Sequence, residues 1–288
     1  MSKRKLAMTI GFKGLPKTRR TLLVDGDIIC YQAVTDPQAY RAESNEDDEW
    51  TFTLDAAAAK DAIVDRLAVM ATSLRAEKVV IAFGSPRGDN WRRKVLREYK
   101  ANRSLLKPLG YGAMRAWMEA QWPSVSAPLL EADDVLGLIQ TGARAGWSCT
   151  GARNEGDDLA VGPYFKGRET IIVSEDKDMA TVPGLWYNPR VGEVVKVTPD
   201  QAKVAHLTQA LTGDKTDNYK GCPGVGAVGA AKVLAVKNPR ARWAATVAAF
   251  KKAGLDEDEA LVQARVARIL QKGDYDPTTG ELTLWHPS

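Results

Sequence analysis

One stretch of the sequence places three carboxylates directly before an apolar run: Glu131-Ala132-Asp133-Asp134, then Val135-Leu136-Gly137-Leu138-Ile139. The apolar run predicts a helix, and acids in its first turn are favoured by free backbone N–H groups and by the helix dipole. Alone, the stretch is best explained as an acidic helix start. It becomes a candidate site only if other carboxylates converge on it.

Acids follow predicted strands at three further places. With the strand before each, they are Asp25 after residues 21–24, Asp89 beyond 78–83, and Asp176 and Asp178 after 169–174. Helical patterns, such as 56–74 and 112–122, separate these strands. The alternation predicts an α/β fold with a mostly parallel, doubly wound sheet. Since the carboxyl ends of parallel strands share one edge, we expect these acids and those at 131–134 to meet in one crevice.

Such a crevice requires cations. Two unit charges about 4 Å apart repel by roughly 4 kcal/mol at an effective dielectric constant near 20. Oxygen ligands suit Mg²⁺, and a carboxylate site for two ions is typical of phosphodiester hydrolysis. The sequence has only two histidines, His206 and His286, which argues against a histidine triad or a histidine-rich zinc site.

Bulk composition bounds the class of protein. The 288 residues are 44% hydrophobic and 26% charged, as in soluble globular proteins, with a net charge of +4. No apolar run has the length of a membrane span. Three cysteines without metal-ligand spacing, Cys30, Cys149 and Cys222, fit free thiols in a reducing cytoplasm. Residues 1–20 hold seven Lys or Arg, no acid and no secretory-signal pattern, and predict a flexible basic arm.

Several segments predict peripheral structure. Residues 36–50 form a polar excursion with five acids at 43–49, and 149–168 read as a loop insertion. The runs 185–187 and 194–197 predict a final pair of strands, and 281–285 a short terminal strand.

A basic stretch follows the second strand. Residues 87–107 hold eight Lys or Arg against two acids, interleaved with Trp91 and Tyr99. A solvated helical face is the simpler explanation of a charge run. The imbalance and the aromatic residues favour a phosphate-binding role.

A change of composition begins near Pro199. A predicted helix at 200–211 leads to Asp214 and Asp217, and then to the glycine-rich residues 221–232. A flexible turn is one explanation of these glycines. Their regular spacing before Lys232 favours a tight hairpin whose N–H groups approach a phosphate backbone.

Five motifs occur in order: DGD at 25–27, YKANR at 99–103, EADD at 131–134, SEDKD at 174–178, and GDKTDN at 213–218 leading into GVGAVG at 224–229. In that order they resemble the 5′-nuclease superfamily, which includes the flap endonucleases. The runs NWRR, YKANR and KPLGY, with ARILQ and LWHP near the end, are most similar to phage 5′–3′ exodeoxyribonucleases. Each motif is weak alone, but the set is specific and spans about residues 21 to 285.

The resemblance implies a division of the chain. Residues 1–20 remain the basic arm, and 21–198 form a PIN-like 5′-nuclease core with a helical arch near 87–111. Residues 199–288 form a helix–hairpin–helix region that binds DNA and often surrounds a K⁺ ion. The implied DNA-binding residues are Arg92, Arg93, Tyr99, Lys100 and Arg103 of the arch, and Gly224, Gly226, Gly229 and Lys232 of the hairpin.

The resemblance also implies two Mg²⁺ ions, for which Mn²⁺ can substitute. The ion nearer the scissile phosphate is held by the catalytic acids Asp25, Asp89, Glu131 and Asp133. The other is served, partly through waters, by Asp134, Asp176, Asp178 and Asp217, with Asp214 nearby. Lys100 acts as an electrostatic catalyst beside the phosphate. Asp89 is assigned as the only acid between Phe83 and Glu98.

The function expected from residues and resemblance together is Mg²⁺-dependent 5′–3′ exodeoxyribonuclease activity on duplex DNA, with cleavage of flaps or of RNA in hybrids as a possible addition. One alternative is a structure-specific flap endonuclease or RNA-primer remover. Another is a DNA-binding scaffold that does not cut. A monomer without membrane contact is expected, in the host cytoplasm if the chain is encoded by a phage.

Overall fold

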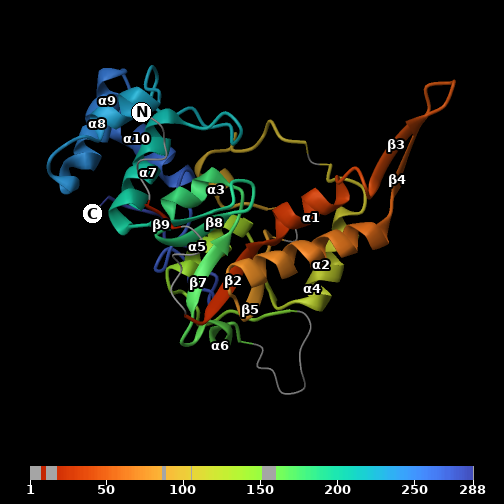
Figure 1. The fold of residues 1–288 in the computed structure, drawn as a ribbon. Coiled ribbons are helices and arrows are strands. Elements are labelled where there is room, and N and C mark those ends of the chain that lie inside the picture. Colours follow the sequence, from red (N-terminus) through yellow and green to blue (C-terminus); the bar gives the residue numbers. More distant parts are fainter. Residues whose placement is uncertain (1–7, 11–17, 86–88, 105, 151–159, 288) are drawn as a thin grey trace.

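A seven-stranded sheet forms the centre of the computed structural model, which describes residues 8–10, 18–85, 89–104, 106–150 and 160–287 (Figure 1). Its strand order is β1-β9-β8-β7-β2-β5-β6. In chain order the strands are β1 (Met8–Ile10), β2 (Arg20–Asp25), β5 (Lys78–Ala82), β6 (Ser124–Val125), β7 (Glu169–Val173), β8 (Gly184–Asn188) and β9 (Glu193–Val197).

The central strands are parallel, as predicted. Strand β2 pairs in parallel with β5 on one side and β7 on the other, and β6 and β8 extend the parallel set outward. Only β9 reverses direction, so that it pairs antiparallel with both β8 and β1. The doubly wound α/β prediction is therefore confirmed, with an antiparallel addition at one edge.

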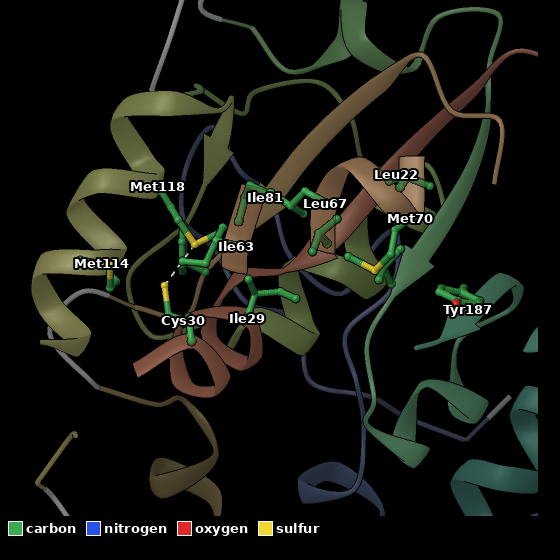
Figure 2. Close-up of a cluster of buried hydrophobic side chains, with 14 of the residues drawn as sticks. Leu22, Ile29, Cys30, Ile63, Leu67, Met70, Ile81, Met114, Met118 and Tyr187 are labelled. Atoms are coloured by element: carbon green, nitrogen blue, oxygen red, sulfur yellow. Dashed lines mark hydrogen bonds between the residues drawn. The ribbon is translucent and has the colours of Figure 1, made fainter. Parts of the chain in front are cut away.

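Helices cover both faces of the sheet. On one face lie α1 (Gly26–Val34), α2 (Ala56–Ser73) and α4 (Tyr111–Gln121), and on the other α5 (Ala132–Gln140) and the short α6 (Gly162–Phe165). Alternation along β2 separates the two cores: Leu22 and Val24 face the first set, and Leu23 faces the second. Figure 2 shows the first core, where Ile63, Met118 and Cys30 pack together over the sheet. This alternation explains why buried strands have continuous apolar sequences.

A second group of helices follows the sheet. It consists of η3 (Lys177–Thr181), α7 (Pro199–Thr212), α8 (Ala227–Val233), η4 (Pro239–Ala241), α9 (Arg242–Lys252) and α10 (Glu257–Val266). Helices α7 to α10 surround their own apolar cluster, centred on Leu211 and Phe250. The chain then returns to the sheet, since Ile269 and Leu270 are buried in the core around α5. The packing therefore crosses the expected boundary at residue 198.

Three expectations differ from the structure. Residues 36–50 were expected to be irregular, but β3 (Tyr40–Ser44) and β4 (Trp50–Leu54) form an antiparallel hairpin that projects from the body, with the acids 43–49 at its tip (Figure 1). Within the expected arm 1–20, residues 8–10 form an edge strand, and 1–7 and 11–17 lie outside the described residues. The predicted terminal strand 281–285 is not formed; within it, Leu282 makes an isolated antiparallel bridge with Tyr275.

The helical arch also differs. In residues 89–104 and 106–110 the only helix is α3 (Arg92–Val95), which ends where Leu96 becomes extended. Lys100 then has a φ of 54°, a left-handed conformation that interrupts any helix. The basic stretch is therefore mostly turns and extended chain, and residues 101–104 within it are exposed. Of the predicted loop insertion 149–168, residues 151–159 lie outside the described part, and Gly162–Phe165 form the short helix α6. Among the described helices, none combines the length and the apolar character that a membrane span needs.

Gly137 allows α5 to pack against the returning C-terminal segment. A Cβ atom at this position would lie 2.3 Å from the Leu270 carbonyl oxygen and 2.7 Å from Ile269 Cγ2. The backbone oxygen cannot move away without disturbing the segment that follows α10. Gly112 in α4 is a matched contrast, because a Cβ there would meet nothing within 4 Å.

We therefore expect opposite effects from two glycine substitutions in helices. Gly137→Ala should lower the free energy of unfolding by about 1–3 kcal/mol, the usual range for overpacking a core. Gly112→Ala should raise it by roughly 0.5–1 kcal/mol, through higher helix propensity. Urea denaturation followed by circular dichroism measures both. Equal effects of the two substitutions would contradict the close approach at Gly137.

Candidate active site

Two of the acids are positioned by the turns that end parallel strands. Asp25 is the last residue of β2 and the N-cap of α1, where its carboxylate accepts hydrogen bonds from the Ile28 N–H at 3.1 Å and the Ser174 hydroxyl at 3.1 Å. Asp176 follows β7 and caps η3, accepting a bond from the Asp178 N–H at 2.7 Å. The strand ends therefore bring acids from β2 and β7 to one edge of the sheet, as predicted.

These acids repel one another. Burial, followed by repulsion from Asp176 and Asp25, holds the pKa of Asp133 well above its usual range. Burial and the neighbouring Asp27 raise the pKa of Asp25 to about 7. Burial and Asp176 likewise raise the pKa of Asp178 to about 7. The group of Asp25, Asp133 and Asp176 therefore holds more negative charge than its surroundings compensate, and we call it the uncompensated acids.

A second set of acids is compensated by basic side chains. Glu131 accepts from Arg92 Nη1 at 2.8 Å and from the Tyr99 hydroxyl at 3.0 Å, and pairs closely with Lys100 Nζ. Burial alone would raise its pKa, but Lys100 and Arg92 hold the pKa of Glu131 at about 2. It is therefore a carboxylate at any physiological pH.

Asp217 belongs to the same compensated set. Its Oδ2 accepts from the Tyr99 hydroxyl at 2.8 Å and lies 3.5 Å from Lys100 Nζ, while Oδ1 pairs with Arg103. The Tyr99 hydroxyl thus bridges Glu131 at the start of α5 and Asp217 in the loop after α7. The YKANR segment therefore joins two distant parts of the chain through its own side chains.

Asp214 is compensated by a different lysine. Its Oδ2 lies 2.9 Å from Lys177 Nζ, and its Oδ1 accepts from the Thr216 N–H at 2.7 Å. Burial would raise the pKa of Asp214, but these bonds hold it below the usual value. The neighbouring Asp178 accepts from Gln209 Nε2 at 2.6 Å and lies 3.7 Å from the same lysine.

The donor set fits a hard divalent cation. The uncompensated acids offer only carboxylate oxygens, the ligands that Mg²⁺ prefers, and a cation would relieve their repulsion. Within the described ranges, no three His, Cys, Asp or Glu side chains are arranged so that they hold a metal ion as they stand. Binding would therefore have to draw these side chains closer together.

Two predicted site residues serve the fold instead. Asp134 was expected to be a metal ligand, and Arg92 a DNA contact, but both are buried. The Arg92 guanidinium donates to both Asp134 oxygens at 2.7 and 2.8 Å, and Asp134 also accepts from Trp91 Nε1 at 3.0 Å and the Leu270 N–H at 3.2 Å. Neither side chain is open to a metal or to DNA, so both assignments are wrong. The reason is helical geometry, because Asp134 lies about 100° around α5 from Asp133.

Asp89 is held close to the strand end where it was expected. Its Oδ1 accepts from the Ser85 hydroxyl and from the Leu129 N–H at 3.1 Å. Residues 86–88, which precede it, lie outside the described part. Its role as a ligand stays a prediction.

Among the other predicted DNA contacts, Tyr99 is buried and Lys100 is only 14% exposed, so neither lies open to DNA as it stands. The rest lie in two regions, the basic stretch and the loop before α8. Arg93 and Arg103 are exposed; Arg103 pairs with Asp217, and Arg93 donates to the Tyr99 carbonyl at 3.4 Å. In the loop before α8, Gly224 and Gly226 are exposed, and a Cβ at either would meet nothing within 4 Å. Gly224 has a φ of 74°, which other residues rarely adopt. Lys232 is exposed on α8, and Gly229 is half-buried against Val225.

Two residues at the site were missing from the predicted set. Asp27 accepts from the Gly84 N–H at 2.9 Å and the Tyr111 hydroxyl at 2.6 Å, and so ties α1 to the end of β5 and to α4. Ser174 is buried and donates to Asp25. Asp27 lies in the DGD motif and Ser174 in the SEDKD motif. Their position in the same motifs as the predicted ligands Asp25 and Asp176 could have identified them.

The sequence and the fold were each compared with those of known proteins. No protein-family model matches the sequence. The chain is 29% identical over 304 aligned residues to an exodeoxyribonuclease of Enterobacteria phage T3, covering 92% of each chain. It is 27% identical to an exonuclease of Escherichia phage T7, covering 92% of this chain and 93% of that one.

Solved structures agree on the fold. A mutant of the phage T5 5′-exonuclease superposes with a TM-score of 0.56 at 13% identity, covering 91% of this chain and 89% of that chain. A T5 5′-exonuclease with bound zinc superposes with a TM-score of 0.53 at 14% identity, covering 86% and 93%. At such low identity the likeness shows the fold alone.

Adjacent acids of α5 should respond oppositely to loss of charge. In the metal-free protein at pH 8, Asp133→Asn should raise the free energy of unfolding by on the order of 1 kcal/mol, because it removes repulsion. Asp134→Asn should lower it by about 3–5 kcal/mol, because it leaves Arg92 buried without its carboxylate. Urea denaturation in the presence of a chelator measures both, and a change of the same sign in both variants would contradict the division of the acids.

The pH dependence provides a further check on the same samples. A carboxyl whose pKa is raised on folding binds its proton more tightly in the folded state. Asp25 and Asp178 therefore contribute to stability at low pH, and that contribution is lost as pH rises from about 4 through about 7. The gain from Asp133→Asn should accordingly be largest above pH 7 and vanish near pH 4.

Proposed function

We propose that this chain, which is similar in sequence to phage exonucleases and in fold to a phage T5 5′-exonuclease, is a metal-dependent 5′–3′ exodeoxyribonuclease of the 5′-nuclease superfamily. It would hydrolyse phosphodiester bonds of duplex DNA from 5′ ends, with two Mg²⁺ ions, for which Mn²⁺ can substitute. Flaps and RNA–DNA hybrids are further substrates under this proposal.

The observation that carries the proposal is the set of uncompensated acids. Asp25, Asp133 and Asp176 come from three separate elements, and each is repelled by others of the set. A protein gains no stability from such an arrangement, because burial and repulsion both oppose ionisation of Asp25 and Asp133. Its benefit must lie in binding a cation. Carboxylates whose pKa values are shifted by burial and by neighbouring charges are concentrated at functional sites.

The ions and the protein have separate tasks in hydrolysis. Bound divalent ions supply an activated water and stabilise the leaving oxygen. Asp25, Asp133, Asp176 and Asp178 would hold them, with Asp214 and Asp217 at the second ion. Lys100 stands beside Glu131 with its ammonium in the half-buried site, where it can stabilise charge that develops on a scissile phosphate. Burial opposes that charge, but Glu131 and Asp217 keep the pKa of Lys100 above its usual value, so the ammonium stays protonated.

Two regions would hold the DNA. Arg103, paired with Asp217, and Arg93, beside Tyr99, are exposed and would contact the strand that enters the site. The open backbone at Gly224 and Gly226 would contact the duplex beyond it, with Lys232 on a neighbouring phosphate and K⁺ bound at the hairpin. A scaffold without activity would not need the uncompensated acids, which favours an enzyme.

Substitution of one uncompensated acid tests the proposal. Asp176→Asn should lower the rate of Mg²⁺-dependent cleavage of 5′-labelled duplex by more than the roughly 100-fold that loss of an outer-shell partner can cost. Asp61→Asn, an exposed acid of α2, is the control and should cleave like the wild type. A time course with 5′- and 3′-labelled duplex, flap and hybrid substrates measures rate and polarity. Cleavage by Asp176→Asn at the wild-type rate would exclude the metal assignment.

The hairpin has its own test in DNA binding. Lys232→Gln should weaken binding to duplexes of any sequence and reduce the slope of log K against log salt by about one. Lys252→Gln, at the end of α9, is the exposed control. Fluorescence anisotropy at several salt concentrations, with Ca²⁺ in place of Mg²⁺, gives both slopes. An unchanged slope for Lys232→Gln would place the duplex elsewhere.

A further inference from the structure

Lys177 lies between two acids of the site. It is the middle residue of the Asp176-Lys177-Asp178 segment, and its Nζ is 2.9 Å from Asp214 Oδ2 and 3.7 Å from Asp178 Oδ1. These carboxylates are 13% and 18% exposed, whereas the lysine side chain is 61% exposed. The ammonium therefore reaches from solvent into a pair of largely buried carboxylates.

Lys177 differs in this respect from Lys100. Lys100 is 14% exposed, pairs with Glu131 and Asp217, and is fixed by a backbone bond from its N–H to the Asp217 carbonyl at 2.9 Å. Lys177 lies in the five-residue η3, and most of its flexible side chain is in water. A lysine of this kind can leave its partners by rotating about its side-chain bonds alone.

The charges at this position also differ from those of the neighbouring acids. Asp25 and Asp133 face other carboxylates, but Asp214 and Asp178 face the Lys177 ammonium. A divalent cation that binds Asp214 and Asp178 would meet that positive charge at the same oxygens. Since like charges this close repel, the ammonium and the cation cannot both keep these oxygens.

We propose that Lys177 is an exchangeable internal counter-ion: its ammonium occupies the Asp178 and Asp214 carboxylates in the metal-free protein and is displaced when a divalent cation binds there. The lysine thereby stabilises the metal-free state and weakens metal affinity at this side of the site. This inference rests on the proposed function, since it requires a divalent cation at these acids.

Metal binding without DNA tests the inference directly. Isothermal titration with Mn²⁺ and thermal unfolding with and without Mg²⁺ would compare the wild type with Lys177→Met, which removes the charge but keeps the chain length. Of the two Mn²⁺ ions, the one bound more weakly should bind to Lys177→Met about fivefold more tightly than to the wild type. This factor is equivalent to about 1 kcal/mol, the upper range for an exposed ion pair. Its Tm should rise more on addition of Mg²⁺ than that of the wild type.

Two matched variants complete the experiment. Lys177→Arg keeps the charge and should behave like the wild type. Lys215→Met removes an exposed lysine from the same neighbourhood, outside the ion pairs of Asp178 and Asp214 that the structure describes, and should leave the isotherm unchanged. Circular dichroism confirms that each variant is folded.

The outcomes separate the two proposals. If the wild type binds Mn²⁺ and Lys177→Met binds it with the same affinity, the counter-ion role is wrong and the metal site stands. If Lys177→Met changes only DNA affinity and its salt dependence, the lysine is a phosphate contact, and the inference is again overturned. If the wild type binds no divalent cation, the proposed function fails together with this inference.

Discussion

The buried ion pair of Arg92 and Asp134 is the constraint on which the site depends. The guanidinium donates to both carboxylate oxygens and to the carbonyls of Val266 and Arg268, while the carboxylate also accepts from the Leu270 N–H. Three distant segments, α3, α5 and the chain after α10, are therefore held at one point. Removing either partner would leave a buried charge uncompensated, which typically costs several kcal/mol. The pair fixes the start of α5, and with it the directions of Glu131 and Asp133.

From that fixed helix start the acids divide into two kinds. Glu131 points toward Arg92, Tyr99 and Lys100, and stays ionised because cations surround it. Asp133 points toward Asp25 and Asp176, where burial and repulsion oppose its ionisation. Two residues of one helical turn thus lie in opposite electrostatic environments. The acids around Asp133 attract a cation. Glu131 holds the Lys100 ammonium close to that cation site.

Much of this arrangement could be predicted from the sequence. Continuous apolar runs followed by Asp25 and Asp176 identified the parallel strands and the edge at which acids meet, because a buried strand and a strand-end carboxylate each have a local pattern. The β3–β4 hairpin was missed although both strands alternate apolar and polar residues, because the five acids at 43–49 indicate a solvated loop. Asp134 and Arg92 were misassigned because a motif records which residues are adjacent, but not which way each side chain points.

The basic stretch contributes side chains that have two competing partners. Lys100 and Arg103 neutralise Glu131 and Asp217, yet the proposed function requires the same two side chains to hold phosphate. One ammonium cannot satisfy a carboxylate and a phosphate fully at the same time, so the two tasks compete. Divalent ions at the acids would supply the missing positive charge and release these side chains toward DNA. On this argument metal and DNA each favour binding of the other, and by linkage the coupling is reciprocal. The Tyr99 hydroxyl, which bridges Glu131 and Asp217, would keep the segment in place during that exchange.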